Sequence, residues 1–234
     1  MPNPSLTGPI RTPRSGGKAK QLVVLLHGWG ADGPNLIDLA DVFSQVLPDA
    51  HFIAPNAPYP CEANPFGYQW FSLMDRTPAN LQAGVENASN ILNQFLDEQL
   101  SLLQSPHHHS SPHHHSSPHP SPLPKGEGIK IALVGFSQGT MTALHVALRR
   151  TPQLAAVVGF SGSLLSAEVK VKPPICLIHG DRDDVVPYGA LAHAETTLKQ
   201  QGVLIEAHSR RGLGHSIDME GLQIAAEFLV KKLA

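Results

Sequence analysis

Short runs of apolar, often β-branched residues alternate along the chain with longer segments whose apolar positions recur at helical spacing. Runs that are apolar at every position are typical of strands buried on both faces of a sheet. We expect such strands at residues 22–26, 52–54, 129–134, 155–160, 175–178 and 203–206. We expect helices at residues 35–47, from about 77 to just before Pro106, and at 138–149, 188–201 and 217–233. This alternation predicts an α/β fold, with a mostly parallel sheet and helices on both faces.

The segment 105–128 interrupts this pattern with Ser-Pro and His-His-His units and almost no apolar residues. Such a segment cannot offset its ordering entropy by burial, so we expect a disordered insertion within a single domain that spans residues 1–234. The histidine runs at 107–109 and 113–115 would also suit Zn, Ni or Cu. We favour a tolerated surface expansion, because loop length is penalised only slowly, and we predict no catalytic metal.

Charge and composition narrow the classes of partner. Lys and Arg total 17 against 19 Asp and Glu, so a net charge of -2 offers no footprint for nucleic acid or an anionic membrane. No stretch approaches 18 uninterrupted apolar residues, and the N-terminal residues do not resemble a secretion signal. Cys61 and Cys176 form neither a disulfide framework nor a metal motif. We expect a cytoplasmic protein without a membrane span, and the sequence does not predict its oligomeric state.

The segment Gly135-Phe136-Ser137-Gln138-Gly139 follows a predicted strand and opens a predicted helix. It fits the G-x-S-x-G nucleophile elbow, a strand-to-helix turn so tight that only small residues fit beside the serine. The turn would lift the Ser137 hydroxyl to the helix N-terminus, where the backbone N–H of Gln138 can face a developing oxyanion. The segment therefore predicts Ser137 as the nucleophile of an α/β-hydrolase.

A second segment, Gly159-Phe160-Ser161-Gly162-Ser163, also follows a predicted strand. It lacks the last glycine of the elbow, and Leu164 and Leu165 lead towards a loop rather than a well-patterned helix. We therefore interpret Ser161 and Ser163 as turn residues at a strand end.

A serine hydroxyl at its normal pKa is a weak nucleophile, so it needs a neighbouring base that a third group holds in place. In this fold the three residues run along the chain in the order Ser, acid, His. His215 lies in a Gly-rich turn between the last strand and the last helix, which makes it the predicted base. We expect His27 and His179 to have structural roles, such as capping a strand end.

Three candidate acids lie in the segment His179-Gly180-Asp181-Arg182-Asp183-Asp184-Val185-Val186-Pro187, directly after a predicted strand. Asp181 can brace the turn by accepting backbone N–H bonds. Asp184 can cap the approach to the next helix or lie in solvent. The residues by themselves leave the choice among the three aspartates open.

Four motifs, in this order, resemble the phospholipase/carboxylesterase family, which includes the acyl-protein thioesterases. They are Leu26-His27-Gly28-Trp29-Gly30, Gly135-Phe136-Ser137-Gln138-Gly139, the segment 179–187 and Gly212-Leu213-Gly214-His215. The resemblance covers the chain from about Gly8, except for the His/Pro/Ser insertion, and implies an α/β-hydrolase fold. It also implies that Asp183 is the triad acid and that the backbone N–H groups of Trp29 and Gln138 form the oxyanion hole.

The chain departs from the family pattern at two positions. Thr140 stands where a second glycine is common, and Trp29 is bulkier than the usual leucine or tyrosine. We expect Thr140 to narrow the approach to the elbow. The loop 55–71 resembles the family's substrate-covering loop, so Trp70 and Phe71 are predicted substrate-binding residues, although an aromatic cluster is also typical of plain packing.

These observations predict a serine carboxylic-ester hydrolase that acts on small to medium acyl esters through an acyl-enzyme and needs no cofactor. An acyl-thioester or lysophospholipid hydrolase is an alternative, because all these substrates pass through the same tetrahedral intermediate. A non-catalytic binding protein on a hydrolase scaffold belongs to a different class, and the presence of Ser, Asp and His together argues against it. A metal-binding module that uses the histidine runs is a third hypothesis.

Overall fold

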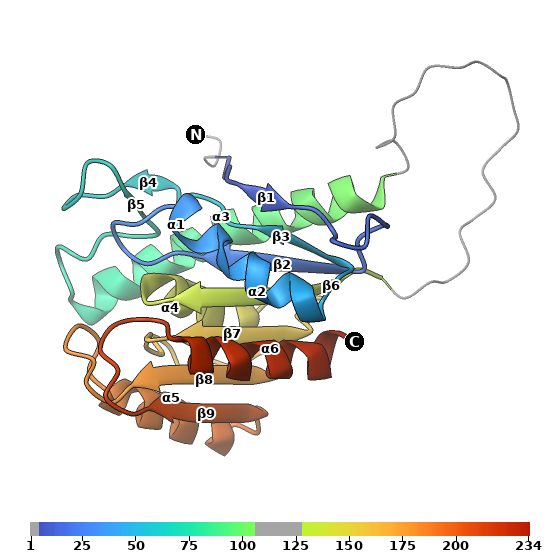
Figure 1. The fold of residues 1–234 in the computed structure, drawn as a ribbon. Helices are drawn as coiled ribbons and strands as arrows, with labels where there is room; N and C mark the ends of the chain where they lie inside the picture. Colours follow the sequence, from blue (N-terminus) through green and yellow to red (C-terminus); the bar gives the residue numbers. More distant parts are fainter. Residues whose placement is uncertain (1–4, 106–127) are drawn as a thin grey trace, which may run out of the picture.

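The computed structural model describes residues 5–105 and 128–234. In this part of the chain a mostly parallel sheet forms the centre of the molecule (Figure 1). Its strands lie side by side in the order β1 (Ile10–Arg11), β3 (Ala50–Ile53), β2 (Gln21–Leu26), β6 (Lys130–Phe136), β7 (Ala156–Phe160), β8 (Ile175–Gly180) and β9 (Ile205–Arg210). The first pair, β1 with β3, is antiparallel, and the other neighbouring strands are parallel. A separate antiparallel pair joins β4 (Tyr59–Pro60) to β5 (Tyr68–Gln69).

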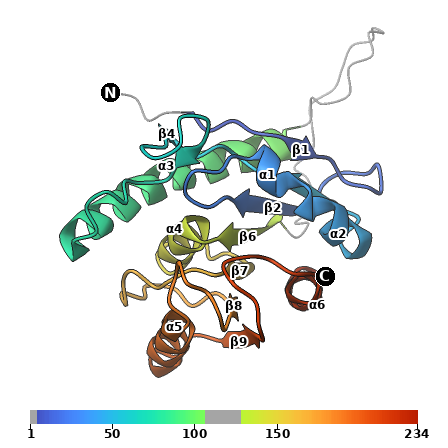
Figure 2. The same cartoon turned by 60° about the vertical axis from the view of Figure 1, so that its left-hand side comes forward.

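Helices cover both faces of the sheet (Figure 2). One face carries α3 (Pro78–Gln104), α4 (Gln138–Ala147) and α5 (Gly189–Gln200), and the other carries α1 (Pro34–Ile37), α2 (Leu39–Val46) and α6 (Met219–Leu233). Strand β2 explains this arrangement, because all six of its residues are buried and successive side chains point to opposite faces. Leu22, Val24 and Leu26 pack towards α3 and α4, whereas Val23 and Leu25 pack towards α2 and α6. The predicted α/β class is confirmed.

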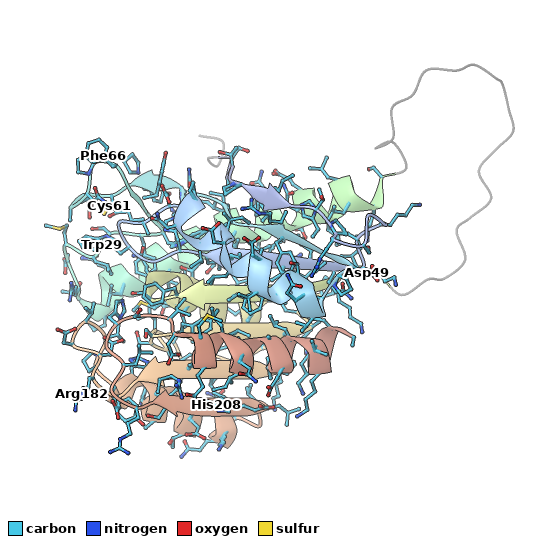
Figure 3. All side chains as sticks on the ribbon, viewed as in Figure 1. Trp29, Asp49, Cys61, Phe66, Arg182 and His208 are labelled. Atoms are coloured by element: carbon cyan, nitrogen blue, oxygen red, sulfur yellow. The ribbon has the colours of Figure 1, made fainter. Side chains whose placement is uncertain are left out.

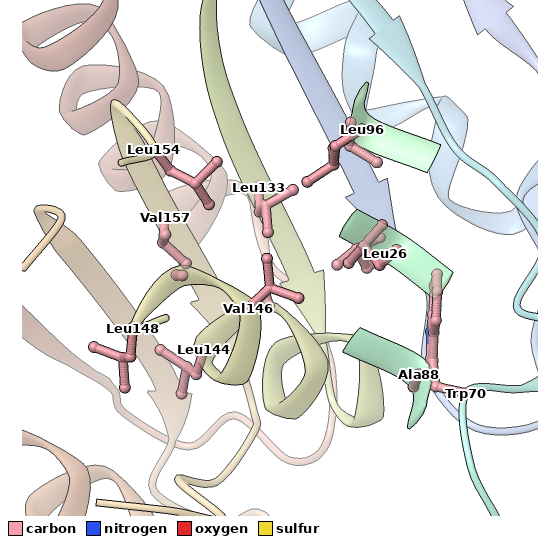
Figure 4. Close-up of a cluster of buried hydrophobic side chains, with 14 of the residues drawn as sticks. Leu26, Trp70, Ala88, Leu96, Leu133, Leu144, Val146, Leu148, Leu154 and Val157 are labelled. Carbon is pink, nitrogen blue, oxygen red and sulfur yellow. The ribbon is translucent and has the colours of Figure 1, made fainter. Parts of the chain in front are cut away.

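On the α3 side, Leu26 and Leu133 from neighbouring strands lie between Leu96 of α3 and Val146 of α4 (Figure 4). These four side chains are at most 1% exposed. Full burial of such a side chain contributes about 1.5–3 kcal/mol, so this cluster holds both helices firmly against the sheet. Trp70 lies in the same cluster and is fully buried.

The structure differs from the predicted elements in a few places. The helix predicted at 35–47 is divided at Asp38 into α1 and α2, where i to i+3 hydrogen bonds such as Asp41 N–H to the Asp38 carbonyl replace the α-helical pattern. The last strand begins at Ile205 rather than at Val203, because Val203 bonds back to the end of α5 and Leu204 is 71% exposed. Strands β1, β4 and β5 are only two residues long, too short for a hydrophobic period to reveal.

The strand order brings together the ends of β2 and β6, although the chain leaves these strands towards opposite sides of the sheet. A crevice forms outside the carboxyl ends of the strands at such a point, and it is the usual place for a binding site in an open α/β sheet. Trp29 and Arg182, which follow β2 and β8, both lie on this edge, on the left of Figure 3, whereas Asp49 lies at the opposite edge. This geometry therefore places the predicted site residues at one edge of the sheet.

The predicted insertion at 105–128 lies, except for its two end residues, outside the described residues. Within 5–105 and 128–234, no helix is both long and apolar enough to span a membrane. Cys61 and Cys176 are buried and unpaired.

Candidate active site

Ser137 lies in the turn between β6 and α4, as the G-x-S-x-G motif predicts. Its φ is +54°, a left-handed conformation that is unfavourable for a residue with a side chain. Two glycines permit the turn, because a Cβ at Gly135 would overlap the backbone of Gly139 and Thr140, and a Cβ at Gly139 would overlap the carbonyl of Leu26. Ser137 is 8% exposed, so a close-packed turn holds the serine at the edge of the sheet.

Asp183 and His215 form a hydrogen-bonded pair at the ends of the neighbouring strands β8 and β9. His215 Nδ1 lies 2.8 Å from Asp183 Oδ2. The other carboxylate oxygen, Oδ1, accepts hydrogen bonds from the backbone N–H groups of Val185 at 3.0 Å and Val186 at 2.8 Å. Oδ1 therefore bonds to the backbone and Oδ2 to the imidazole, and the Asp183 side chain is 0% exposed.

The environment of Asp183 keeps the carboxyl group ionised. Burial by itself would raise the pKa of Asp183, but hydrogen bonds from His215 and from the Val186 and Val185 N–H groups outweigh it, so the pKa lies below its usual value. A charged, desolvated carboxylate can hold the tautomer of an imidazole and stabilise the imidazolium that forms when the ring takes a proton. The buried His179 also approaches this carboxylate, with Nε2 3.2 Å from Asp183 Oδ2 and 2.9 Å from the Val186 carbonyl, in keeping with a structural role.

The loop that carries His215 packs its backbone against the end of β8. A Cβ at Gly180 would overlap the carbonyl groups of Leu213 and Gly214, so a glycine is required for this approach. The Arg182 N–H donates to the Leu213 carbonyl at 3.0 Å. These contacts bring His215 to the residues that follow β8, including Asp183.

The other two candidate acids have different surroundings. Asp181 Oδ1 accepts a hydrogen bond from the Gly212 N–H at 2.6 Å, so Asp181 braces the loop of His215 rather than its own turn. Asp184 is exposed. Of the three aspartates, Asp183 is the one that the structure joins to His215.

Phe136 links the elbow to the same histidine. Its ring centroid lies 4.8 Å from that of His215, with an angle of 44° between the planes. Because Phe136 directly precedes Ser137, this contact brings the imidazole beside the elbow. Phe136 is a variable position of the G-x-S-x-G motif, and nothing in the local sequence indicates a partner so distant along the chain.

His27 holds the turn after β2 in place. Its Nε2 accepts a hydrogen bond from the Ala57 N–H at 2.9 Å, so Nδ1 carries the proton and donates to the Gly28 carbonyl at 2.7 Å. Burial lowers the pKa of His27, so the ring stays neutral at pH 7. Because the peptide group is planar, fixing the Gly28 carbonyl also fixes the direction of the Trp29 N–H. A Cβ at Gly28 would lie 3.4 Å from the Cβ of Ser137, so this turn lies directly against the elbow.

The Gln138 side chain ties the predicted substrate loop to the start of α4. Its Oε1 accepts from the Trp70 N–H at 2.9 Å, and its Nε2 donates to the Phe71 carbonyl at 2.7 Å. The Trp70 indole N–H donates to the His27 carbonyl at 2.9 Å. Trp70 and Phe71 are 0% and 2% exposed, so they pack beneath the site, and their predicted contact with substrate stays a prediction.

Ser161 shares one property with Ser137, since its φ is +47°. The two serines differ in the next element of the chain, because α4 begins directly after Ser137 whereas no helix lies between β7 and β8. Ser161 is 1% exposed, and its hydroxyl has no hydrogen-bond partner among the described residues. Ser161 is thus less accessible than Ser137 and lies at no helix N-terminus.

Thr140 does not narrow the approach to the elbow, so this expectation is wrong. The residue is 1% exposed, and its hydroxyl donates to the Phe160 carbonyl at 2.8 Å. The side chain points into the protein between α4 and the end of β7, since that is where its hydrogen-bond acceptor lies.

Across residues 5–105 and 128–234, no three His, Cys, Asp or Glu side chains lie close enough together to hold a metal ion. The histidine runs at 107–109 and 113–115 lie outside these ranges.

Comparison with known proteins gives consistent results. A family model described as phospholipase/carboxylesterase matches residues 10–233. The Escherichia coli (strain K12) protein described as esterase YpfH is 29% identical over 215 residues, covering 90% of this chain and 82% of the relative. Acyl-protein thioesterase 1 of Neurospora crassa is 27% identical over 227 residues, covering 90% and 86% of the two chains. The crystal structure of esterase PE8 superposes with a TM-score of 0.82 at 38% identity and covers 97% of this chain and 99% of that one.

The family model spans nearly the whole chain, and the superposition covers almost all of it. The resemblance to the phospholipase/carboxylesterase family and the predicted α/β-hydrolase fold are therefore both confirmed. The chain belongs to the phospholipase/carboxylesterase family of α/β-hydrolases.

Proposed function

We propose that this protein is a serine hydrolase that cleaves carboxylic esters or thioesters, with Ser137 as nucleophile, His215 as base and Asp183 as the acid that orients the base. One observation carries the proposal. The buried Asp183 and the partly buried His215 form a hydrogen-bonded pair at the same sheet edge as a serine in a strained strand-to-helix turn, and the ring of His215 contacts the residue before that serine. A binding protein has no need of this combination.

In the proposed reaction, the Ser137 hydroxyl attacks the carbonyl carbon of the substrate while His215 takes its proton. The carbonyl oxygen becomes an oxyanion, which the backbone N–H groups of Trp29 and Gln138 stabilise. His215 then gives its proton to the leaving alcohol or thiol, and the acyl group stays on Ser137. Water then attacks the acyl-enzyme while His215 takes its proton, and His215 returns that proton to the Ser137 oxygen as the bond to the acyl group breaks, which releases the acid and restores the serine.

The contacts around Trp29 and Gln138 support their role as donors. The neutral His27 ring fixes the peptide group that carries the Trp29 N–H. Gln138 is the first residue of α4, where helix geometry leaves backbone N–H groups without intrahelical partners. Its side chain is held by two hydrogen bonds to residues 70 and 71, so both donors are held rigidly before a substrate arrives.

The names of the relatives support the range of substrates. One is described as an esterase and another as an acyl-protein thioesterase. We propose small to medium acyl esters as the preferred class, with acyl-thioesters and lysophospholipids as alternatives. We also propose a reducing, cytoplasmic setting, which the two unpaired, buried thiols support.

Hydrolysis of p-nitrophenyl esters from acetate to palmitate, measured beside an acyl-thioester, tests the proposed activity. We expect turnover with at least the shorter esters, and the relative kcat/KM values across the series give the preferred chain length. If neither the esters nor the thioester is turned over by folded protein, the chain is a binding protein on a hydrolase scaffold and the proposal is wrong.

A fluorophosphonate probe should label Ser137 and no other serine, because the reagent needs an activated hydroxyl beside an oxyanion hole. Peptide mass mapping locates the adduct, and prior denaturation is the control that should abolish it. An adduct on Ser161 or Ser163 would transfer the nucleophile to the end of β7.

Chelation should leave ester hydrolysis unchanged, because no step of the proposed reaction uses a Lewis acid. Activity that disappears with EDTA and returns with zinc would assign the chemistry to the histidine runs instead.

Deletion of residues 105–124 should likewise preserve kcat and KM and remove only affinity for nickel, since the segment has few apolar residues to bury.

A further inference from the structure

The second Gly-Phe-Ser segment, residues 159–162 at the end of β7, has a structural partner in Thr140. A Cβ at Gly159 would overlap the Thr140 Cγ2 methyl group, and a Cβ at Gly162 would overlap Thr140 Cβ. Thr140 is 1% exposed. Gly159 and Gly162 therefore form a socket that the Thr140 side chain fills, which explains why these two positions are glycines.

The Thr140 hydroxyl shares its acceptor with the elbow. The Phe160 carbonyl accepts a hydrogen bond from Thr140 Oγ1 at 2.8 Å and another from the Ser137 N–H at 2.9 Å. The Thr140 N–H donates to the Ser137 carbonyl at 3.0 Å. Thr140 therefore holds Ser137 from two directions, directly through its own backbone and indirectly through the Phe160 carbonyl.

This arrangement matters because Ser137 is strained. A residue with a side chain at φ +54° persists only where its surroundings hold it, and the Phe160 carbonyl is the acceptor for its N–H group. The peptide group between Phe160 and Ser161 is also fixed at its other end, since the Ser161 N–H donates to the Ile178 carbonyl at 2.9 Å. The Thr140 hydroxyl completes this set of bonds from the side of α4.

We propose that Thr140 is a positioning residue for Ser137. Its hydroxyl holds the Phe160 carbonyl in the orientation that fixes the nucleophile, and its methyl group fills the socket of Gly159 and Gly162. The inference rests on the proposed function of Ser137. The two groups of the Thr140 side chain thus have different roles, because the hydroxyl acts on the reaction rate and the methyl group on the stability of the fold.

Thr140→Ser and Thr140→Ala test this separation, because both lack the methyl group and they differ only in the hydroxyl. Measured where both variants are fully folded, Thr140→Ser should keep kcat within about twofold of the parent, whereas Thr140→Ala should lose about tenfold in kcat with KM nearly unchanged. The melting temperatures of both variants should fall. Equal kcat values for the two variants would overturn the role of the hydroxyl. Equal values that also match the parent would mean that Thr140 has only a structural role.

The socket has its own test, which uses alanine at each glycine. Gly159→Ala should lower the melting temperature and kcat, and adding Thr140→Ser should recover much of both, because it removes the Cγ2 atom that the new Cβ would overlap. The remaining close neighbour, Leu177 Cδ2 at 2.9 Å, is the flexible end of a side chain. Gly162→Ala is the matched control, since its Cβ would overlap Thr140 Cβ, which serine keeps, so Thr140→Ser should not rescue it. Rescue of both glycine variants, or of neither, would overturn the proposed socket.

These outcomes remain distinct from a failure of the proposed function. If parent protein hydrolyses esters and Ser137→Ala does not, the kcat comparison at Thr140 applies as designed. If the parent is inactive towards every ester and thioester, the proposed function fails and the positioning role fails with it, while the melting temperatures of the glycine variants still decide the socket.

Discussion

Replacing Ser137 by alanine should abolish ester turnover while leaving the fold intact. The hydroxyl is the only group lost, and the proposed reaction has no other nucleophile, so kcat should fall by roughly 10⁴-fold or more. The melting temperature should stay close to that of the parent, because no hydrogen bond from the Ser137 hydroxyl holds the turn among the described contacts, whereas its backbone bonds to Phe160 and α4 remain. Ester hydrolysis and thermal unfolding, measured on the same preparation, provide the check.

Ser161→Ala is the matched control, since Ser161 also has a left-handed φ and also ends a parallel strand. It should retain most of the activity. If Ser161→Ala is inactive and Ser137→Ala is active, the nucleophile has been assigned to the wrong strand.

Replacing Asp183 by asparagine should lower kcat by roughly 10³- to 10⁴-fold. The reason is specific to the contacts of this side chain. Oδ1 accepts two backbone N–H bonds, so an asparagine oxygen would take that position and its NH₂ group would face His215 Nδ1. Nδ1 would then have to accept a hydrogen bond, which leaves the proton on Nε2 and prevents the ring from acting as a base. Steady-state kinetics with one ester, which give kcat and KM separately, measure the loss.

The two neighbouring aspartates serve as controls with different expected results. Asp184→Asn should stay within about tenfold of the parent, as expected for an exposed charge near a site. Asp181→Asn should act mainly through stability, because Asp181 accepts the Gly212 N–H bond that braces the loop of His215. A large loss of kcat in either control, together with an active Asp183→Asn variant, would require a different acid.

The sequence predicted the features whose physical causes are local. Strands such as 22–26 are apolar at every position because they are buried on both faces, and this pattern is visible without any partner. The elbow is local only in part. A Cβ at Gly135 would overlap the backbone of Gly139 and Thr140, whereas the demand for a glycine at 139 comes from the Leu26 carbonyl on β2. Short elements escaped prediction for the opposite reason, because β1, β4 and β5 are too short to carry a pattern.

The sequence by itself therefore determined the fold class and the position of Ser137, while the tertiary structure decided what lies around that serine. Residues alone left three aspartates open, and the resemblance to a family favoured Asp183. Only the folded chain shows that Gly180 lets the loop of His215 approach β8 and that the bond from His215 goes to Asp183. The fit of Thr140 into the socket at the end of β7 is of the same kind. Such contacts depend on atoms brought together across neighbouring strands, and no periodicity within one segment records them.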